Sequence, residues 1–207
     1  MSAVPADAAR TTSTRAELEA LHCWEAGDRV PRPGMTKFRR RLRLEQALWR
    51  EAKGYPIGSQ PIDPKPGRRS RLVGSRLPLD YAREAGANFL TPAAFTAAKA
   101  RLNTLEPHQT LDHQRIWADL LWSPVLAFNL FGDLATGLEA ADHAVHIWWP
   151  DTPGRVSDVR FEHSPGRLDP AYLNSLRTLD AVFVLELDDG RRGVLAVDVK
   201  VPRVAQA

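Results

Sequence analysis

Two aspartates and a lysine stand at the ends of two adjacent apolar segments in the C-terminal part of the chain. Asp180 begins the segment DAVFVLEL, and Asp198 and Lys200 end the segment RGVLAVDVK. Charge at the end of an apolar strand costs free energy unless another group pairs with it. A divalent cation pairs with carboxylates, and Mg²⁺ prefers one or two of them with water or a phosphate oxygen in its other positions. These residues therefore predict a metal site for phosphate chemistry, with the lysine orienting or deprotonating the attacking water or neutralising charge on the phosphate.

The spacing of the two aspartates fits a β-hairpin with one kind of turn. A three-residue loop over 188–190, with Gly190 in the left-handed conformation, sets Asp180 opposite Asp198 on the same face. A two-residue loop shifts the register by one residue and turns Asp180 to the other face. We therefore predict the three-residue loop, or a bulge with the same effect. From the spacing alone, a structural Asp–Lys ion pair at the end of a sheet is the alternative.

Glu162 is the third candidate carboxylate. It closes a segment in which Val159 and Phe161 alternate with polar residues, just before the turn SPGR at 164–167. This alternation predicts a half-buried strand. Glu162 adds a carboxylate to the same metal cluster if the strand lies beside the hairpin. The alternative is a strand residue that faces solvent.

Basic residues gather in the first part of the chain. Residues 1–77 hold 16 Lys and Arg against 8 Asp and Glu, a net charge of +8, whereas residues 78–207 hold 12 against 17, a net charge of −5. This asymmetry is typical of a polyanion-binding region beside a metal or carboxylate site. A solvated basic surface without a partner is the alternative.

Two segments carry most of the basic residues of interest. Residues 36–53 predict an amphipathic helix that docks through Phe38, Leu42 and Trp49 and holds its arginines outward. Residues 54–79, rich in Pro and Gly, predict a long irregular loop. Arginine matches phosphate geometry through its planar guanidinium. The predicted nucleic-acid contacts are Arg39, Arg43, Arg50, Arg68, Arg69 and Arg71.

The remaining elements are helical before Pro150 and extended after it. We predict helices from Ser13, over 91–102 with Pro92 in the first turn, and over 112–123. A mostly buried helix resumes after Pro124, and a short helix follows Asp169-Pro170 to about residue 176. Helices followed by a strand, a short helix and a hairpin indicate an α+β or α/β fold.

Composition indicates the size of the core, the compartment and the absence of a membrane span. The chain has 207 residues, which is long enough for a sizeable core, and its single cysteine, Cys23, favours a reducing compartment. No apolar run is long enough to span a bilayer, and the N-terminus has no apolar signal segment. We therefore expect a cytoplasmic protein with no membrane association.

Several segments together carry a resemblance to a known family. The pattern D-x17-D-x-K from Asp180 to Lys200 resembles the core signature of the PD-(D/E)XK nuclease superfamily. Between about residues 37 and 200, the chain is similar to a group of bacterial restriction-endonuclease-like proteins within that superfamily. The segments that carry the similarity are FRRRLRLEQALWREAKGYPIG (38–58), GSRL (74–77), NFLTP (88–92), FNLFGDL (128–134), FEHSPGR (161–167) and LDAVFVLEL (179–187).

The resemblance implies an α/β fold with a restriction-endonuclease-like core, a mixed central sheet flanked by helices, after a helical N-terminal half. Asp180 and Asp198 match the metal-binding acids, Lys200 the motif lysine and Glu162 an accessory acid. Members of the superfamily usually continue past the lysine into a helix and a strand, whereas this chain ends seven residues later, so we expect a domain shortened at its C-terminus. The expected organisation is a flexible or weakly helical segment over 1–35 and a nuclease-like domain over 36–207.

The predicted function is hydrolysis of DNA phosphodiester bonds by an endonuclease that uses Mg²⁺ or Mn²⁺ held by Asp180, Asp198 and Glu162. Double-stranded DNA is the expected partner, and restriction enzymes often work as homodimers. The alternative is a catalytically inactive protein of the same fold that binds nucleic acid or another protein. A third reading is a hydrolase of small phosphoesters built on the same metal site.

Overall fold

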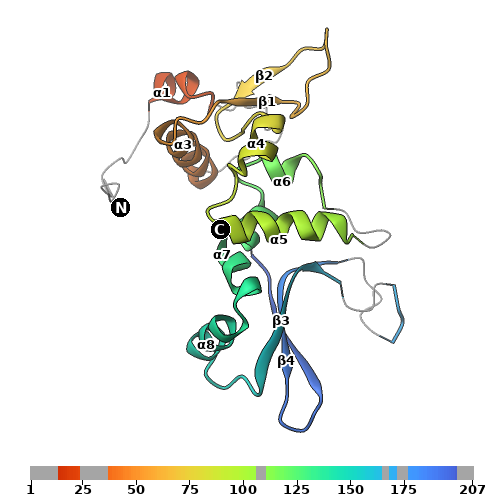
Figure 1. Ribbon diagram of the computed structural model, residues 1–207. Coiled ribbons are helices and arrows are strands. Elements are labelled where there is room, and N and C mark those ends of the chain that lie inside the picture. Colours follow the sequence, from red (N-terminus) through yellow and green to blue (C-terminus); the bar gives the residue numbers. More distant parts are fainter. Residues whose placement is uncertain (1–13, 24–36, 106–110, 165–167, 172–176, 200–207) are drawn as a thin grey trace. The chain divides into compact units, whose positions relative to one another are not determined.

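The computed structural model describes residues 14–23, 37–105, 111–164, 168–171 and 177–199. The chain forms two compact units, residues 1–76 and residues 77–207. Figure 1 labels most of the helices and strands of both units. Within the described ranges, no helix is long and apolar enough to cross a membrane.

The first unit packs two helices around a small apolar core. Helix α1 (Arg15–Ala20) begins with a capping box, in which the Thr14 hydroxyl accepts from the Glu17 N–H and the Glu17 carboxylate accepts from the Thr14 N–H. Helix α3 (Lys37–Ala52) confirms the helix predicted over 36–53. The core residues are Leu18, Cys23, Leu44 and Ala47, with Leu21 and Leu48 packed against them.

The buried stripe of α3 differs from the predicted one. Leu44 and Ala47 face the core, whereas the predicted docking residues Phe38, Leu42 and Trp49 are only half-buried. The stripe is displaced because the core partners come from α1 and Cys23, which the periodicity of α3 alone does not specify.

Arg50 lies on the buried side of α3. It is 5% exposed, its Nε donates to the Gly74 carbonyl at 3.0 Å, and its Nη1 donates to the Tyr55 carbonyl at 2.8 Å. The expectation that the helix holds Arg50 outward is therefore wrong. The physical reason is that interior carbonyls require donors, and the guanidinium supplies two of them.

The stretch 54–79 is not irregular throughout. Strands β1 (Gly58–Gln60) and β2 (Arg71–Val73) pair antiparallel, with Gly58 opposite Val73. Gly74 directly follows β2. A Cβ atom there would lie 2.1 Å from the Leu21 carbonyl oxygen, so only glycine lets the chain pass this close to the end of α1.

Six helical elements open the second unit. Helix α5 confirms the helix predicted over 91–102, with Thr91 capping its first turn through a bond from the Ala94 N–H at 3.1 Å. The elements in order are α4 (Leu79–Ala85), α5 (Pro92–Asn103), α6 (Arg115–Ala118), α7 (Ser123–Phe131), the 3₁₀ helix η1 (Gly132–Thr136) and α8 (Leu138–Trp148).

Two of the predicted helices are shorter than expected. The helix over 112–123 is reduced to α6, because Asp119 leaves the helical region and its carboxylate accepts from the Leu121 N–H at 3.2 Å. The continuous helix expected after Pro124 breaks at Gly132, where η1 begins. A Cβ atom at Gly132 would lie 2.5 Å from the Ala94 Cα of α5, so glycine permits this close approach.

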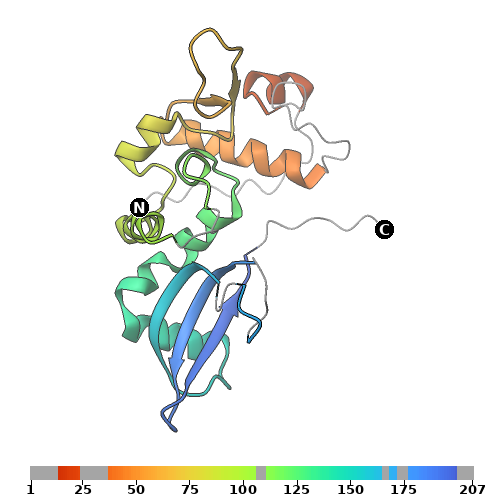
Figure 2. The same ribbon diagram turned by 90° about the vertical axis from the view of Figure 1, so that its right-hand side faces the viewer.

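The second unit ends in a three-stranded sheet. Its strands are β3 (Arg155–His163), β4 (Leu179–Glu186) and β5 (Arg192–Val197), in the order β3-β4-β5 (Figure 2). The predicted strand before residue 163 and the predicted hairpin are confirmed. All strand pairings among the described residues are antiparallel, so the parallel pairing of a mixed sheet is not found within them. The helix expected after Asp169-Pro170 and most of the SPGR turn fall outside the described residues.

One face of this sheet packs against helices. The Phe161 ring of β3 lies 4.5 Å from that of Phe128 in α7, and the Phe183 ring of β4 lies 5.7 Å from that of Phe131. Figure 1 shows α7 and α8 on this side of the strands. Because neighbouring strand residues point to opposite faces, Asp180 and Val182 of β4 point away from these helices.

Candidate active site

The strand register brings the three predicted acids into one row. Between β3 and β4, Phe161 pairs with Ala181 and His163 with Leu179, so Glu162 lies across from Asp180. Between β4 and β5, Ala181 pairs with Val197, and the next position along places Asp198 beside Asp180. Strands β3 and β4 and the residue directly after β5 therefore each bring one carboxylate to the same end of the sheet.

The turn between β4 and β5 produces this register. The Leu187 N–H donates to the Arg191 carbonyl at 2.9 Å, and the Gly190 N–H donates to the Leu187 carbonyl at 2.9 Å. Gly190 has a φ of 78°, in the left-handed region. The predicted three-residue loop with glycine in its last position is therefore confirmed.

Asp180 occupies the middle of the row. It is half-buried, and its Oδ2 accepts a hydrogen bond from the Val199 N–H at 2.6 Å. Burial raises the pKa of Asp180 above its ordinary value, and the neighbouring Asp198 carboxyl raises it further, whereas the bond from Val199 acts in the opposite direction. The ionised form of Asp180 is thus disfavoured by burial and by the carboxyl group beside it.

Glu162 is the most buried acid of the row. It is 7% exposed, and its Oε2 accepts from the Thr178 hydroxyl at 3.0 Å. Its Oε1 is buried without a hydrogen-bond donor among the described residues. Burial, with a smaller contribution from Asp180, raises the pKa of Glu162 to about 7. A buried carboxylate oxygen without a donor is a position that a proton or a cation would satisfy.

Comparison with known proteins places the chain in a family. The sequence model of the PD-(D/E)XK nuclease superfamily matches residues 33–202. The chain belongs to the PD-(D/E)XK nuclease superfamily. No curated protein and no solved structure matches the chain significantly. The resemblance noted in the sequence is thereby confirmed, and the family implies a nucleic-acid substrate.

PD-(D/E)XK nucleases generally use divalent metals, and the chemistry of this row fits such an ion. The side chains offer only carboxylate oxygens, which are the ligands that Mg²⁺ and Mn²⁺ prefer. The Glu162 Oε1 atom lacks a donor among the described residues. Asp198 raises the pKa of Asp180, and Asp180 raises that of Glu162, so a positive charge in the row would favour the ionised carboxylates. As they stand, however, no three or more His, Cys, Asp or Glu side chains within the described ranges form a ready metal-binding group.

The other two residues of the predicted signature lie after β5. Asp198 directly follows the strand and is exposed. Lys200 lies outside the described residues, so its role stays a prediction.

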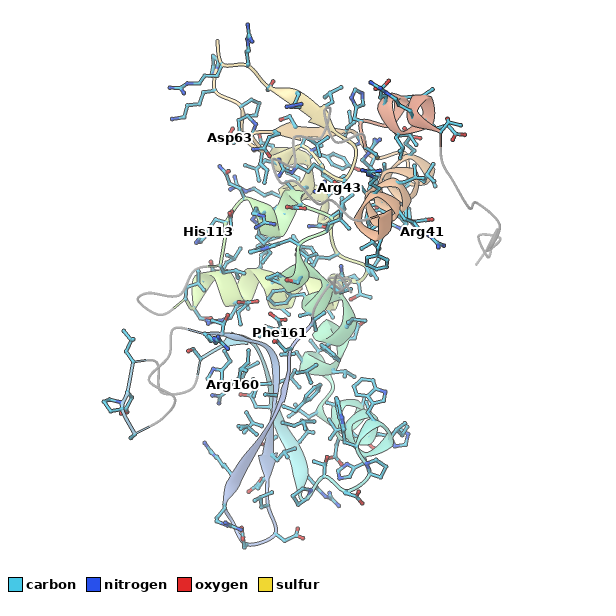
Figure 3. All side chains as sticks on the ribbon, turned by 180° about the vertical axis from the view of Figure 1, so that it is seen from behind. Arg41, Arg43, Asp63, His113, Arg160 and Phe161 are labelled. Carbon is cyan, nitrogen blue, oxygen red and sulfur yellow. The ribbon has the colours of Figure 1, made fainter. Side chains whose placement is uncertain are left out.

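The predicted nucleic-acid contacts all belong to the first unit. Arg68 and Arg69 are exposed on the chain between β1 and β2, and Arg71 is half-buried in β2. Arg43, seen on α3 in Figure 3, is half-buried and donates to the Ser75 hydroxyl at 3.3 Å. The side chain of Arg39 lies outside the described part of the chain, and the interior position of Arg50 removes it from a contact surface.

Sequence reasoning missed Thr178, which binds Glu162. A signal for it exists, because Thr178 precedes Asp180 by two residues and therefore shares its face in an extended chain. The predicted boundary between residues 35 and 36 stays a prediction.

Proposed function

We propose that this chain is an endonuclease that hydrolyses phosphodiester bonds in double-stranded DNA with Mg²⁺ or Mn²⁺. The observation that carries the proposal is the row Glu162–Asp180–Asp198, in which a buried Glu162 oxygen lacks a donor within the described part of the chain. The row lies in a chain of the PD-(D/E)XK nuclease superfamily. On this basis we also propose a restriction-endonuclease-like core around the sheet and a homodimer as the working form.

Each residue of the row has a proposed role in hydrolysis. Asp180 and Asp198 would hold the ion, and Glu162 would add a carboxylate from the neighbouring strand. Once bound, the ion stabilises negative charge on the phosphate and lowers the pKa of the attacking water. Lys200, two residues after Asp198, orients that water or neutralises charge on the phosphate. The water loses a proton to solvent as its oxygen forms a bond to phosphorus, the bond from phosphorus to the leaving oxygen breaks, and that oxygen takes up a proton from solvent.

The basic residues of the first unit are the proposed contacts to the DNA backbone. Arg68 and Arg69 are exposed, and Arg43 and Arg71 are partly exposed on neighbouring elements. Guanidinium groups bind phosphates and release counterions, so this binding is salt-dependent and independent of base sequence. Arg39 is retained in the proposed contact surface, and Arg50 is not.

One observation favours a second function, nucleic-acid binding without catalysis. Among the residues that the structure describes, the acids are not arranged as a ready metal-binding group. A protein of this kind keeps the basic surface and the fold but turns over no substrate.

The experiment that separates the two functions is cleavage of supercoiled plasmid DNA by the purified chain. Mg²⁺ or Mn²⁺ is added, and Asp198→Ala is the matched variant because its side chain is exposed and its loss leaves the fold intact. We expect nicked or linear DNA with the wild type, at least 100-fold less with the variant, and equal DNA binding by both. Binding without metal-dependent cleavage by the wild type would establish the second function.

A further inference from the structure

Arg101 of α5 binds the backbone of β3 at the candidate site. Its Nε donates to the Phe161 carbonyl at 2.7 Å, and its Nη2 donates to the Glu162 carbonyl at 2.9 Å. One edge of the guanidinium thus holds two successive carbonyls, in the planar geometry that distinguishes arginine from lysine. Figure 3 marks Phe161 and Arg160 on this strand.

Two successive carbonyls do not point the same way in a regular strand, where they alternate between the two edges. Here the residue between the two peptide groups, Glu162, has a φ of 47°, in the left-handed region. That conformation turns both carbonyls toward the same side, and it costs about 1–2 kcal/mol for a residue with a side chain. The bonds from Arg101 stabilise this kink.

The kink also determines where the Glu162 side chain goes. A side chain leaves the backbone at its own Cα atom, so the left-handed φ of Glu162 sets the direction in which its side chain starts, and that side chain is buried. In its buried position the Glu162 carboxylate accepts from Thr178 and lies next to Asp180. The position of this carboxylate in the row therefore depends on the kink.

Arg101 is itself held in place. A groove of about 500 Å³ lies between α5, η1 and β3, and Arg101 lines it as it reaches from helix to strand. Its Nη1 donates to the Thr104 carbonyl at the end of α5, at 2.9 Å. The guanidinium is therefore held by the end of its own helix as well as by the strand. This keeps the geometry at Glu162 preorganised.

We propose that Arg101 is a positioning residue that holds the Glu162 carboxylate in the metal-binding row through the backbone of β3. The inference deepens the proposed function and rests on it. In this role Arg101 acts through the backbone of β3 and not as a ligand of the ion. A residue that orients a metal ligand typically changes metal affinity by about 10–100-fold when it is replaced.

Metal affinity distinguishes the positioning role from a purely electrostatic effect, because the two predict changes in opposite directions when Arg101 is replaced. Removing a positive charge close to three acids should tighten cation binding if charge alone matters. We expect the reverse, with Arg101→Gln binding Mn²⁺ at least tenfold more weakly than the wild type in calorimetry of the full chain. Arg101→Lys keeps the charge but loses the two-carbonyl geometry, and it should be weakened as well.

Arg160→Gln is the matched control. Arg160 is an exposed arginine on the same strand, paired with Asp158 at 2.7 Å, and its removal deletes the same charge without touching the kink. We expect its Mn²⁺ affinity to stay equal to the wild type or to rise slightly. Circular dichroism and thermal unfolding of every variant establish that only folded proteins are compared.

A double-mutant cycle tests whether Arg101 acts through Glu162. In a Glu162→Gln background, Arg101→Lys should have no further effect on Mn²⁺ affinity. Wild-type affinity in the Arg101→Lys variant, or a full additional loss in the double variant, would overturn the positioning role while leaving the metal site intact. Absence of Mn²⁺ binding by the folded wild type would instead overturn the proposed function, and this inference with it.

Discussion

The backbone N–H of Val199 donates a hydrogen bond to the Asp180 Oδ2 atom at 2.6 Å. This bond ties the segment after β5 to the first residues of β4. Asp198 immediately precedes Val199, so the bond keeps the two aspartates side by side at the end of the hairpin. Asp180 thus acts as a backbone acceptor in addition to its proposed role as a metal ligand.

The two roles of Asp180 are separable by substitution. Asparagine keeps an oxygen acceptor for the Val199 N–H, whereas alanine leaves that N–H, in a residue that is 8% exposed, without one. We expect Asp180→Ala to be less stable than Asp180→Asn by about 1–2 kcal/mol in thermal unfolding without metal. Both should bind Mn²⁺ much more weakly than the wild type. The same pair of changes at exposed Asp198 should differ by less than about 0.5 kcal/mol, and a larger difference there would count against this assignment.

The pKa of Glu162, about 7, makes metal binding depend on pH. The carboxyl must lose its proton to bind a cation, so Mn²⁺ affinity should fall about tenfold for each pH unit below 7 and level off above pH 8. Calorimetry in two buffers of different ionisation enthalpy measures the released proton directly. Release that is equal at pH 6 and pH 8.5 would show that Glu162 takes no part in binding.

The same pKa makes the stability of the metal-free protein depend on pH. The folded state holds a proton on Glu162 up to about pH 7, whereas the unfolded chain releases it near the ordinary value of 4.5. The contribution of Glu162 to the free energy of unfolding should therefore be greatest below pH 4.5 and decline by about 3 kcal/mol between pH 4.5 and about pH 7. The raised pKa of Asp180 acts in the same direction.

Glu162→Gln removes this ionisation. In urea unfolding without metal, the variant should show a smaller decline between pH 5 and pH 8 and exceed the wild type in stability at pH 8. Adding Mn²⁺ should stabilise the wild type at pH 8 and have much less effect on the variant. Identical pH profiles for the two proteins would refute the raised pKa.

Two arginines of α3, Arg50 and Arg41, should contribute very differently to the free energy of unfolding. Arg50→Ala removes the guanidinium bonds to the buried Gly74 carbonyl and the partly buried Tyr55 carbonyl, and it should cost about 2–4 kcal/mol in urea unfolding. Arg41→Ala is the control on the same helix, because the Arg41 side chain is 71% exposed and pairs only loosely with Glu45. It should change stability by less than about 0.5 kcal/mol. Equal effects of the two changes would contradict the interior position of Arg50.

Exposed arginines of the first unit should instead govern DNA binding. Replacing Arg68 and Arg69 together by alanine should leave unfolding unchanged, because both side chains are exposed. If each contacts a phosphate, the slope of log affinity against log salt should fall by about 2. Fluorescence anisotropy with two unrelated duplexes gives that slope, and an unchanged slope would place the contact surface elsewhere.

Local sequence was sufficient for the hairpin and its two aspartates. The loop DDG has one glycine, and a three-residue turn with that glycine in the left-handed conformation determines which residues of β4 and β5 face each other. The capping box at Thr14 and the start of α5 at Thr91-Pro92 were predictable for the same reason, because each depends on residues within one turn. The two helix breaks escaped prediction, since the one at Gly132 depends on the approach of α5.

The rest of the site depended on contacts between distant segments. The pairing of β3 with β4 places Glu162 across from Asp180. The direction of the Glu162 side chain depends on its left-handed backbone, which Arg101, 61 residues away, stabilises. Arg50 likewise faces inward because Gly74 and Tyr55 present carbonyls to it from other elements. The sequence alone determined which acids share a hairpin, because turn geometry is local. The tertiary structure decided which of the charged groups are buried and what they bind, because interior hydrogen-bond partners come from anywhere in the chain.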